Sequence, residues 1–336
     1  MQNQRVSTRF SRLITPYRGF GPSLWSMFFA TIINRFGDFV GPFLALYLSR
    51  ALAFDAARTG LMVSVVFGAS TLGAFASGRV ADSIGRKRAL MACQTLAALM
   101  NLAVGFDYAA AWAPWLIAVG SFFRGGARPL IGAVLTDLAP KDRRKEVFGL
   151  QYWCINVGSA VGPLVAAALF NGALPWLFRG DAACTLASVL LIARGVRMPA
   201  GAGAAATSLE RHDERGALRA FLARPILLAF ALIALASSIT YSQTGFGLPL
   251  TLSALFGPLG PRYFGYLMSL NGLAVIALSV PIARLLRNRR PLACMFFSGA
   301  FYVVGFGIYA FPLGFAGFCA ATLVWTIGEI VAAVNM

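Results

Sequence analysis

Charged side chains are scarce in this chain of 336 residues and make up only 12% of it. An ordinary soluble domain carries about 25% charged residues. The low charge, together with 58% hydrophobic residues and a mean hydropathy of +0.72, excludes a soluble globular domain. A bilayer core needs about 20 apolar residues per helix, and the sequence supplies runs of that length repeatedly. We therefore predict an all-α membrane protein, built as a polytopic helical bundle.

Histidine, paired cysteines and catalytic motifs are also scarce or missing. The one histidine, His212, lies in a charged stretch, and the five cysteines fall inside apolar segments without CxxC or CxxH spacing. The sequence contains no GxSxG, HExxH, GxxxxGKS or GxxxxGKT motif. We therefore predict that the chain is not an enzyme, has no catalytic residues, holds no metal ion and needs no cofactor.

Acidic residues number 12 against 29 Lys and Arg, which gives a net charge of +17. A nucleic-acid-binding protein gathers such cations on one solvated face. Here most of them lie in short connections between apolar runs, so we predict no nucleic-acid partner. Ten runs are long enough to span a bilayer, at about 24–48, 58–78, 89–108, 113–137, 147–170, 174–194, 225–247, 262–283, 292–311 and 313–335.

The distribution of Lys and Arg predicts the orientation of these spans. The cations concentrate in the N-terminal segment and in the connections after the second, fourth, sixth and eighth runs. All of these lie on one side of a ten-span arrangement, and the positive-inside rule assigns that side to the cytoplasm. We expect an integral protein of the plasma (inner) membrane, in contact with the lipid bilayer and with its N-terminus in the cytoplasm.

The longest connection divides the spans into two groups. It begins with "PAGAGAAATS", which is typical of a flexible linker, and continues as "LERHDERGALRAFL", which predicts an amphipathic helix on the inner membrane surface. The predicted organisation is a six-helix bundle at 1–195, a cytoplasmic linker at 196–223 and four further helices at 224–336. Two basic turns, "GRKRALMAC" and "RNRRPLAC", occupy equivalent places in the two groups, as in transporters built from related halves.

The stretch "GRVADSIGRKRAL" at 78–90 contains residues that membrane topology alone does not explain. A basic turn explains the cations, but it leaves Gly78, Asp82 and Gly85 unexplained. Glycine suits a chain reversal or close helix packing, and an acid next to a helix end can bind backbone N–H groups or an arginine. The pattern resembles the signature loop between helices 2 and 3 of the major facilitator superfamily.

Other stretches resemble the multidrug-resistance branch of this superfamily, whose members are drug:proton antiporters. They are "NRFGDFVGPFLALYLSR" (34–50), "RGGARPLIGAVLTDLAPKDRRKEVFGL" (124–150), "NVGSAVGP" (156–163), "YSQTGFGLPLTL" (241–252), "LNG" (270–272) and "WTIGEIVAAVN" (325–335). The resemblance implies a proton-coupled secondary transporter that exports drugs or other amphipathic small molecules by alternating access. We expect it to act as a monomer.

The resemblance also implies roles for individual residues. Arg124 corresponds to the helix 4 cation linked to proton coupling, and a cytoplasmic gate loop consists of Gly78, Asp82, Gly85, Arg86 and Arg88. The superfamily has twelve spans, whereas this chain has about ten, which suggests a C-terminally truncated chain. The sequence contains no ATP-binding motif, so an ion gradient would drive transport.

Ionisable residues inside the spans are functional candidates, because a charge at mid-bilayer costs about 2.5–3.5 kcal/mol. At about 1.5 Å per residue, Asp38 and Arg124 lie at a similar depth, roughly 20 Å from the inner ends of their helices. They can therefore face each other, although an i,i+3 pair between Arg35 and Asp38 is the local alternative. We predict Asp38 as the first proton carrier and Glu329 as the second.

Three intramembrane arginines, Arg35, Arg124 and Arg128, outnumber the two acids Asp38 and Glu329 in this assignment. The excess predicts a water-filled cavity in which an arginine meets water, a carbonyl or substrate. The predicted substrate cavity contains Arg35, Arg128, Tyr241, Gln243 and Asn271, although polar residues in spans also bond neighbouring helices.

The helix 5 motif of Gly158, Gly162 and Pro163 fits either a gating role or ordinary close packing of helices. Two further functions stay open. One is a proton-linked carrier of a single metabolite, a sugar or an organic acid, in which Arg128 binds an anion. The other is a truncated membrane fragment that does not transport.

Overall fold

A computed structural model describes residues 19–199, 224, 235, 238–286, 289, 291–311 and 314–335. The predicted linker helix, most of the predicted seventh span and the basic turn at 287–290, apart from Arg289, lie outside these residues. The described part is helical and contains no strand. Six helical segments are long and apolar enough to cross a membrane, which confirms the predicted all-α membrane fold.

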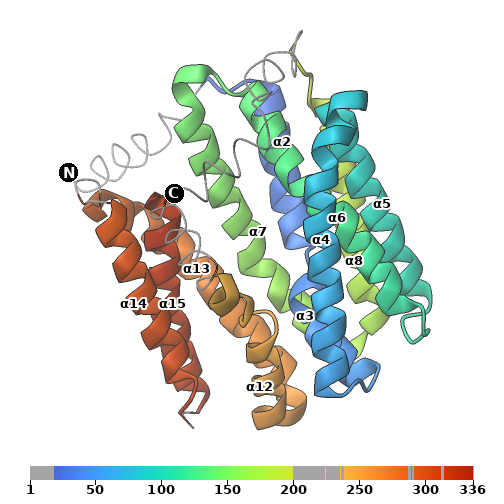
Figure 1. Cartoon of the computed structure of the whole chain (residues 1–336), viewed down its shortest axis with the longest axis vertical. Coiled ribbons are helices and arrows are strands. Elements are labelled where there is room, and N and C mark those ends of the chain that lie inside the picture. The colour runs from blue at the N-terminus through green and yellow to red at the C-terminus, as the bar shows by residue number, and fades with distance from the viewer. Residues whose placement is uncertain are drawn as a thin grey trace, which may run out of the picture.

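The first helices form one bundle, in which α7 lies at the border with the later helices (Figure 1). These elements are α2 (Pro22–Phe36), α3 (Val40–Leu46), η2 (Tyr47–Ala51), α4 (Ala56–Ile84), α5 (Arg86–Phe106), α6 (Ala113–Leu138), η3 (Lys141–Arg143), α7 (Arg144–Gly172) and α8 (Leu174–Gly195).

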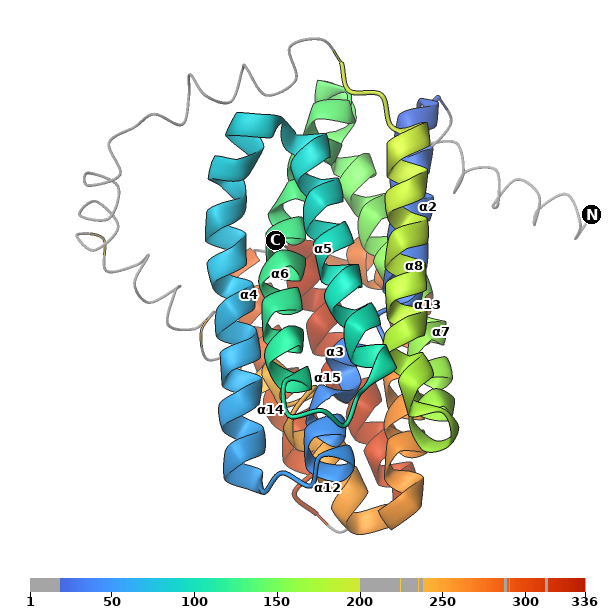
Figure 2. The ribbon, with the colours of Figure 1, turned by 90° about the vertical axis from the view of Figure 1, so that its right-hand side faces the viewer.

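The later helices stand beside α7, and α13 is the helix that packs against it (Figures 1 and 2). They are α12 (Gly247–Phe256), η4 (Gly257–Leu259), α13 (Gly260–Leu286), α14 (Pro291–Ile308) and α15 (Phe315–Asn335).

The first predicted span differs from the structure because it is not one helix. α2 ends at Phe36, α3 begins at Val40, and the π-helix η2 carries the chain on to Ala51. A new helix start leaves backbone N–H groups without an intrahelical partner. A carboxylate of α8 accepts one of them, from Val40 N to Asp181 Oδ2 at 3.3 Å, so the break is stabilised by a neighbouring helix.

The predicted end of the seventh span, at residue 247, is also wrong. Residues 243–246 form a turn, and α12 then continues from Gly247 to Phe256. Ser242 and Thr244 donate their hydroxyls to the backbone carbonyls of Ile239 and Tyr241. Such local bonds compete with the helical ladder, which accounts for the interruption.

The motif on α7 brings three helices into close contact. A Cβ added to Gly158 would lie 2.6 Å from Arg35 Cβ, and one added to Gly162 would lie 2.5 Å from Phe36 O. On α13, a Cβ added to Gly272 would lie 2.8 Å from Ala160 Cα of α7. Small residues therefore let α7 pack directly on α2 and on α13, and they fix the position of Arg35.

The two groups of helices meet in an apolar cluster around η2. It contains Phe43, Tyr47, Met62, Leu248, Leu252 and Phe264. The guanidinium of Arg50 donates to the carbonyls of Ser253 and Gly257 at 3.1 and 2.7 Å, near the end of α12. This end of the molecule is therefore closed by contacts between early and late helices.

Candidate functional site

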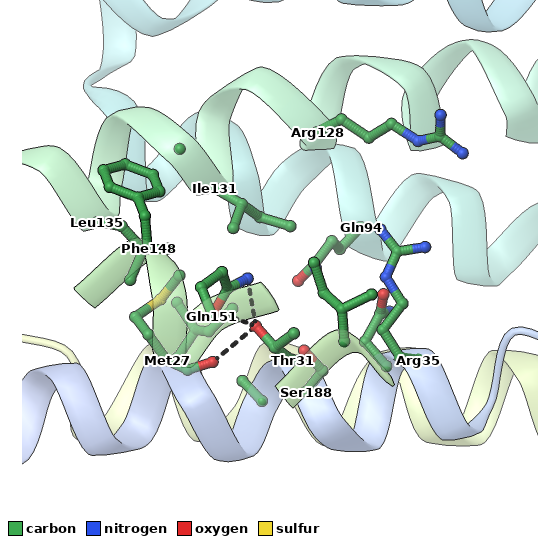
Figure 3. Close-up of a pocket in the computed structure, with 15 residues that line it drawn as sticks. Met27, Thr31, Arg35, Gln94, Arg128, Ile131, Leu135, Phe148, Gln151 and Ser188 are labelled. Atoms are coloured by element: carbon green, nitrogen blue, oxygen red, sulfur yellow. Dashed lines mark hydrogen bonds between the residues drawn. The ribbon is translucent and has the colours of Figure 1, made fainter. Parts of the chain in front are cut away.

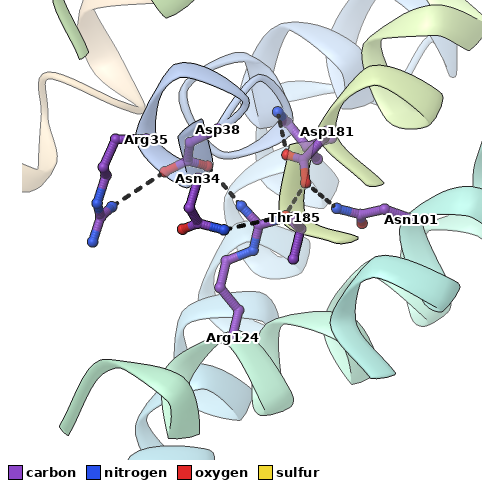
Figure 4. Close-up of polar contacts among 8 residues, drawn as sticks. Asn34, Arg35, Asp38, Asn101, Arg124, Asp181 and Thr185 are labelled. Atoms are coloured by element: carbon purple, nitrogen blue, oxygen red, sulfur yellow. Dashed lines mark hydrogen bonds and ion pairs between the residues drawn. The ribbon is translucent and has the colours of Figure 1, made fainter. Parts of the chain in front are cut away.

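An arginine in the middle of α6 holds two carboxylates from different helices (Figure 4). Arg124 Nη1 lies 2.6 Å from Asp38 Oδ1, and Arg124 Nη2 lies 2.7 Å from Asp181 Oδ1. Asp38 belongs to the break between α2 and α3, and Asp181 belongs to α8. The structure thus brings Asp38 and Arg124 together, as their similar depth in the bilayer predicts.

The two carboxylates of this network differ in their surroundings. Asp181 is 1% exposed and also accepts from Asn101 Nδ2 at 2.9 Å and from the backbone N–H of Val40. Asp38 has a side chain that is 24% exposed, and it also contacts Arg35, whose Nη1 lies 3.5 Å from Asp38 Oδ2. The local Arg35 pair and the long-range Arg124 pair therefore coexist.

Asp181 is the residue that the sequence reasoning missed. Its position within the predicted span 174–194 was the available signal, because any acid inside a span is a candidate. With Asp181 included, the acids equal the three arginines of that assignment in number, and Arg179 of the same helix, which was left out of it, donates to a backbone carbonyl. The pairing is nevertheless uneven, since Arg124 takes two carboxylates and Arg128 has no hydrogen bond or ion pair among the described residues.

A cavity of about 420 Å³ lies next to this network, toward the start of α2 (Figure 3). It is lined by residues of α2, α5, α6, α7 and α8 and is partly open. Of the predicted cavity residues, Arg35 and Arg128 line it, whereas Tyr241, Gln243 and Asn271 do not. Thr31 and Gln151, which also line it, are hydrogen-bonded to each other.

A second polar cluster lies among the later helices. Asn271 Nδ2 donates to Glu329 Oε2 at 2.8 Å and to Thr326 Oγ1 at 2.9 Å. The hydroxyl of Tyr241 donates to Glu329 Oε1 at 3.4 Å. Tyr241 and Asn271 therefore surround Glu329, while Gln243 is an exposed residue of the 243–246 turn.

The predicted gate loop is shorter than expected, because α4 runs to Ile84 and α5 begins at Arg86. Gly85 alone makes the turn, with φ of +89°, a conformation that L side chains rarely adopt. Gly78 lies inside α4, and an added Cβ there would meet no described atom within 4 Å. The expectation that Gly78 serves a turn or close packing is therefore wrong for the described residues.

The cations of this loop make specific contacts. Arg86 Nη1 lies 2.6 Å from Asp137 Oδ1, which ties α5 to α6. Lys87 Nζ donates to the carbonyls of Ala193 and Val196 at 2.9 and 2.7 Å, at the end of α8. Asp82 and Arg88 are exposed and have no hydrogen bond or ion pair within the described ranges.

The described residues contain no group of three or more His, Cys, Asp or Glu that could hold a metal ion. The arrangement instead offers paired charges and a cavity lined by two arginines inside a helical bundle. A family model described as Major Facilitator Superfamily matches residues 27–336. The chain belongs to this family.

Relatives within the major facilitator superfamily include two with described activities. A Na(+), Li(+), K(+)/H(+) antiporter of Planococcus maritimus is 26% identical over 330 residues, covering 87% of this chain and 74% of the relative. A multi-drug resistance efflux pump PmrA homolog of Lactococcus lactis is 26% identical over 144 residues, 41% of this chain and 35% of the relative.

The solved structures support the fold. The crystal structure of the nucleoside transporter NupG aligns with a TM-score of 0.72 at 16% identity, over 93% of this chain and 80% of that chain. The major facilitator fold is thereby confirmed. As a member of the superfamily the chain is an integral membrane transporter of small molecules and not an enzyme.

Proposed function

We propose that this transporter is a proton-coupled antiporter that exports drugs or other amphipathic small molecules by alternating access. The observation that carries the proposal is the clamp of Arg124 on Asp38 and Asp181 inside the membrane. Charges are rare in spans and cluster on ion pathways. The resemblance to drug:proton antiporters and the relatedness to a cation/proton antiporter support the same reading.

The two acids would have different tasks. Asp181 is buried and holds three partners, Arg124, Asn101 and the N–H of Val40, so it anchors the arginine. Asp38 is the more exposed carboxylate and is shared between Arg124 and Arg35. A carboxylate binds a proton more readily when a neighbouring arginine moves away. We therefore propose Asp38 as the first proton carrier.

Glu329 is the second proposed proton carrier. Its oxygens accept from Asn271 and Tyr241, and no cation lies within ion-pair distance among the described residues. In this scheme the helices at 1–195 and 224–336 rock against each other along α7 and α13, in a monomer. Glu329 and Asp38, on different sides of that contact, would then bind and release protons in different states.

The proposed orientation places the N-terminus in the cytoplasm of a cell with this protein in its inner membrane. The apolar cluster around η2, with the contacts of Arg50, is then the closed outer end. The 420 Å³ cavity lies on the inner side of the ion pairs of Arg124 with Asp38 and Asp181. The loop around Gly85 and Arg86 lies at the inner end, where we propose that it gates the cavity.

Substrate-dependent proton flux in proteoliposomes tests this function. With an amphipathic dye, anionic or cationic, as substrate, Asp38→Asn and Arg124→Ala should each lower flux at least tenfold relative to the unaltered protein. The matched control is Asp55→Asn. Asp55 forms an i,i+3 pair with Arg58, as Asp38 does with Arg35, but on the exposed start of α4. Full flux in both network variants would refute the coupling assignment.

A second candidate is a proton-linked carrier of one metabolite, a sugar or an organic acid. Arg128 favours it, because this arginine lines the cavity and has no ion pair in the part of the chain that the structure describes. The same vesicles loaded with a labelled sugar or a labelled organic acid separate the two candidates, because a dye exporter leaves both labels in place. Absence of flux with every substrate would favour a fragment that does not transport.

A further inference from the structure

The 420 Å³ cavity has a charge of one sign only. Arg35 and Arg128 are its charged lining residues, and no Asp or Glu is among the described residues that line it. Arg128 has no ion pair within the described ranges, and the contact of Arg35 with Asp38, at 3.5 Å, is longer than that of Arg124 with Asp38. Arg128 is exposed and Arg35 is half-buried, and two cations that face one cavity without a lining acid attract an anionic group.

Two buried polar atoms of the same cavity lack partners. Gln94 is 4% exposed and Ser188 is 1% exposed, and neither Gln94 Oε1 nor Ser188 Oγ has a hydrogen-bond partner in the described structure. A buried polar atom without a partner costs roughly 1–3 kcal/mol. Because an amide oxygen only accepts hydrogen bonds, a ligand that satisfies Gln94 must carry a donor.

The cavity is also divided along its length. Figure 3 shows Arg35, Gln94 and Arg128 gathered at one end, and Leu135 and Phe148 at the other. Met27, Ile131, Ile155 and Ile192 are further apolar residues of the lining. A molecule with one charged end and an apolar body matches this division.

We propose that this cavity is a binding site for an amphipathic organic anion with a hydrogen-bond donor next to its charged group. The anionic group lies between Arg35 and Arg128, the donor meets Gln94 Oε1, and the apolar body lies toward Phe148 and Leu135. The assignment names the substrate class of the proposed transport function and rests on it, but binding can be measured without transport.

Mandelate, which carries a carboxylate, a hydroxyl next to it and a phenyl ring, is the first probe. Its neutral amide, mandelamide, lacks the charge, phenylacetate lacks the hydroxyl, and 2-phenylethylammonium has the opposite charge. Binding to the full chain in lipid nanodiscs is measured by titration calorimetry. Mandelate should bind about 10- to 100-fold more tightly than mandelamide and the cation, the range expected for a hydrogen bond to a charged group.

Variants locate the site. Arg128→Gln should abolish the preference for mandelate over mandelamide, and Arg128→Lys should retain part of it. Ser188→Ala and Gln94→Met should weaken the preference for mandelate over phenylacetate. Ser269→Ala is the matched control, because Ser269 is also buried with an unpartnered hydroxyl but does not line the cavity. Thermal unfolding of each variant checks that it folds.

Failure to bind mandelate, a preference for the amide or the cation, or unchanged discrimination in Arg128→Gln would each overturn the proposed site. The transport function has a separate criterion. If dye-driven proton flux is absent while the anion preference and its dependence on Arg128 are present, the transport proposal fails and the binding site stands. If proton flux is present without any anion preference, the proposed binding site fails and the transport proposal stands.

Discussion

Removal of the Arg124 guanidinium should destabilise the protein mainly through one of its two partners. In Arg124→Gln, Asp38 loses a 2.6 Å contact but is partly exposed and still faces Arg35. Asp181 loses a 2.7 Å contact in a site that is 1% exposed. Breaking a buried ion pair from one side costs about 3–5 kcal/mol. Because Asp181 keeps its bonds from Asn101 and Val40, we expect about 3 kcal/mol, at the lower end.

A double-mutant cycle isolates this interaction. Asp181→Asn removes the charge and leaves Arg124 paired with Asp38, so the single variant should lose less stability than Arg124→Gln. Arg124→Gln/Asp181→Asn should be more stable than Arg124→Gln alone, with a coupling energy of about 2 kcal/mol. The free energy of unfolding is measured by SDS titration in mixed micelles.

The exposed pair of Asp55 and Arg58 is the control for this cycle. Their side chains are 64% and 76% exposed, and the closest atoms lie 3.8 Å apart, so a coupling energy of about 0–0.5 kcal/mol is expected. A coupling between Arg124 and Asp181 no larger than that of the control pair would refute the reasoning. A larger coupling to Asp38 than to Asp181 would refute the assignment of Asp181 as the anchor.

Two further predictions concern the contacts that hold the helices in place. Gly158→Leu should lower the free energy of unfolding by about 1–3 kcal/mol, because a Cβ at Gly158 would lie 2.6 Å from Arg35 Cβ. Gly149→Leu is the control and should leave the free energy of unfolding unchanged, because no described atom lies within 4 Å of a Cβ at Gly149. SDS titration measures both. Cys319 packs against the apolar cluster around η2 and is half-buried. With Cys319 as the only cysteine retained, Arg50→Ala should open this cluster and raise the rate of maleimide labelling by about 3- to 10-fold, whereas Arg262→Ala should leave that rate unchanged.

The sequence predicts the contact between Asp38 and Arg124 because helix rise alone fixes the depth of each residue. It does not fully predict the break that separates α2 from α3. Gly37, Gly41 and Pro42 are a local signal for an interrupted helix, but they do not show what stabilises the new helix start. The break depends on Asp181, an acid more than a hundred residues away that accepts from Val40, and such a contact is not visible in local sequence.

The second polar cluster, like the first, is predictable only in part. The sequence identifies Tyr241, Asn271 and Glu329 as polar residues in apolar runs. Which of them meet is decided by how α13 and α15 pack, and that packing left Gln243 outside the cluster while it brought Asn271 to 2.8 Å from Glu329. The sequence correctly predicts a turn at Gly85, whose positive φ favours glycine. The same expectation is wrong for Gly78, which lies within a helix.

The break in the first span and the arginine clamp depend on each other. An interrupted helix inside a bilayer needs a partner for its free N–H groups, and Asp181 supplies it with Oδ2 while Oδ1 accepts from Arg124 and Asn101. Both oxygens of Asp181 are thereby occupied, so the second amino group of Arg124 can hold only the acid at the break itself. Asp38 is accordingly the carboxylate that can lose its partner without exposing a helix end, and this supports the proposal that Asp38, rather than Asp181, carries the proton.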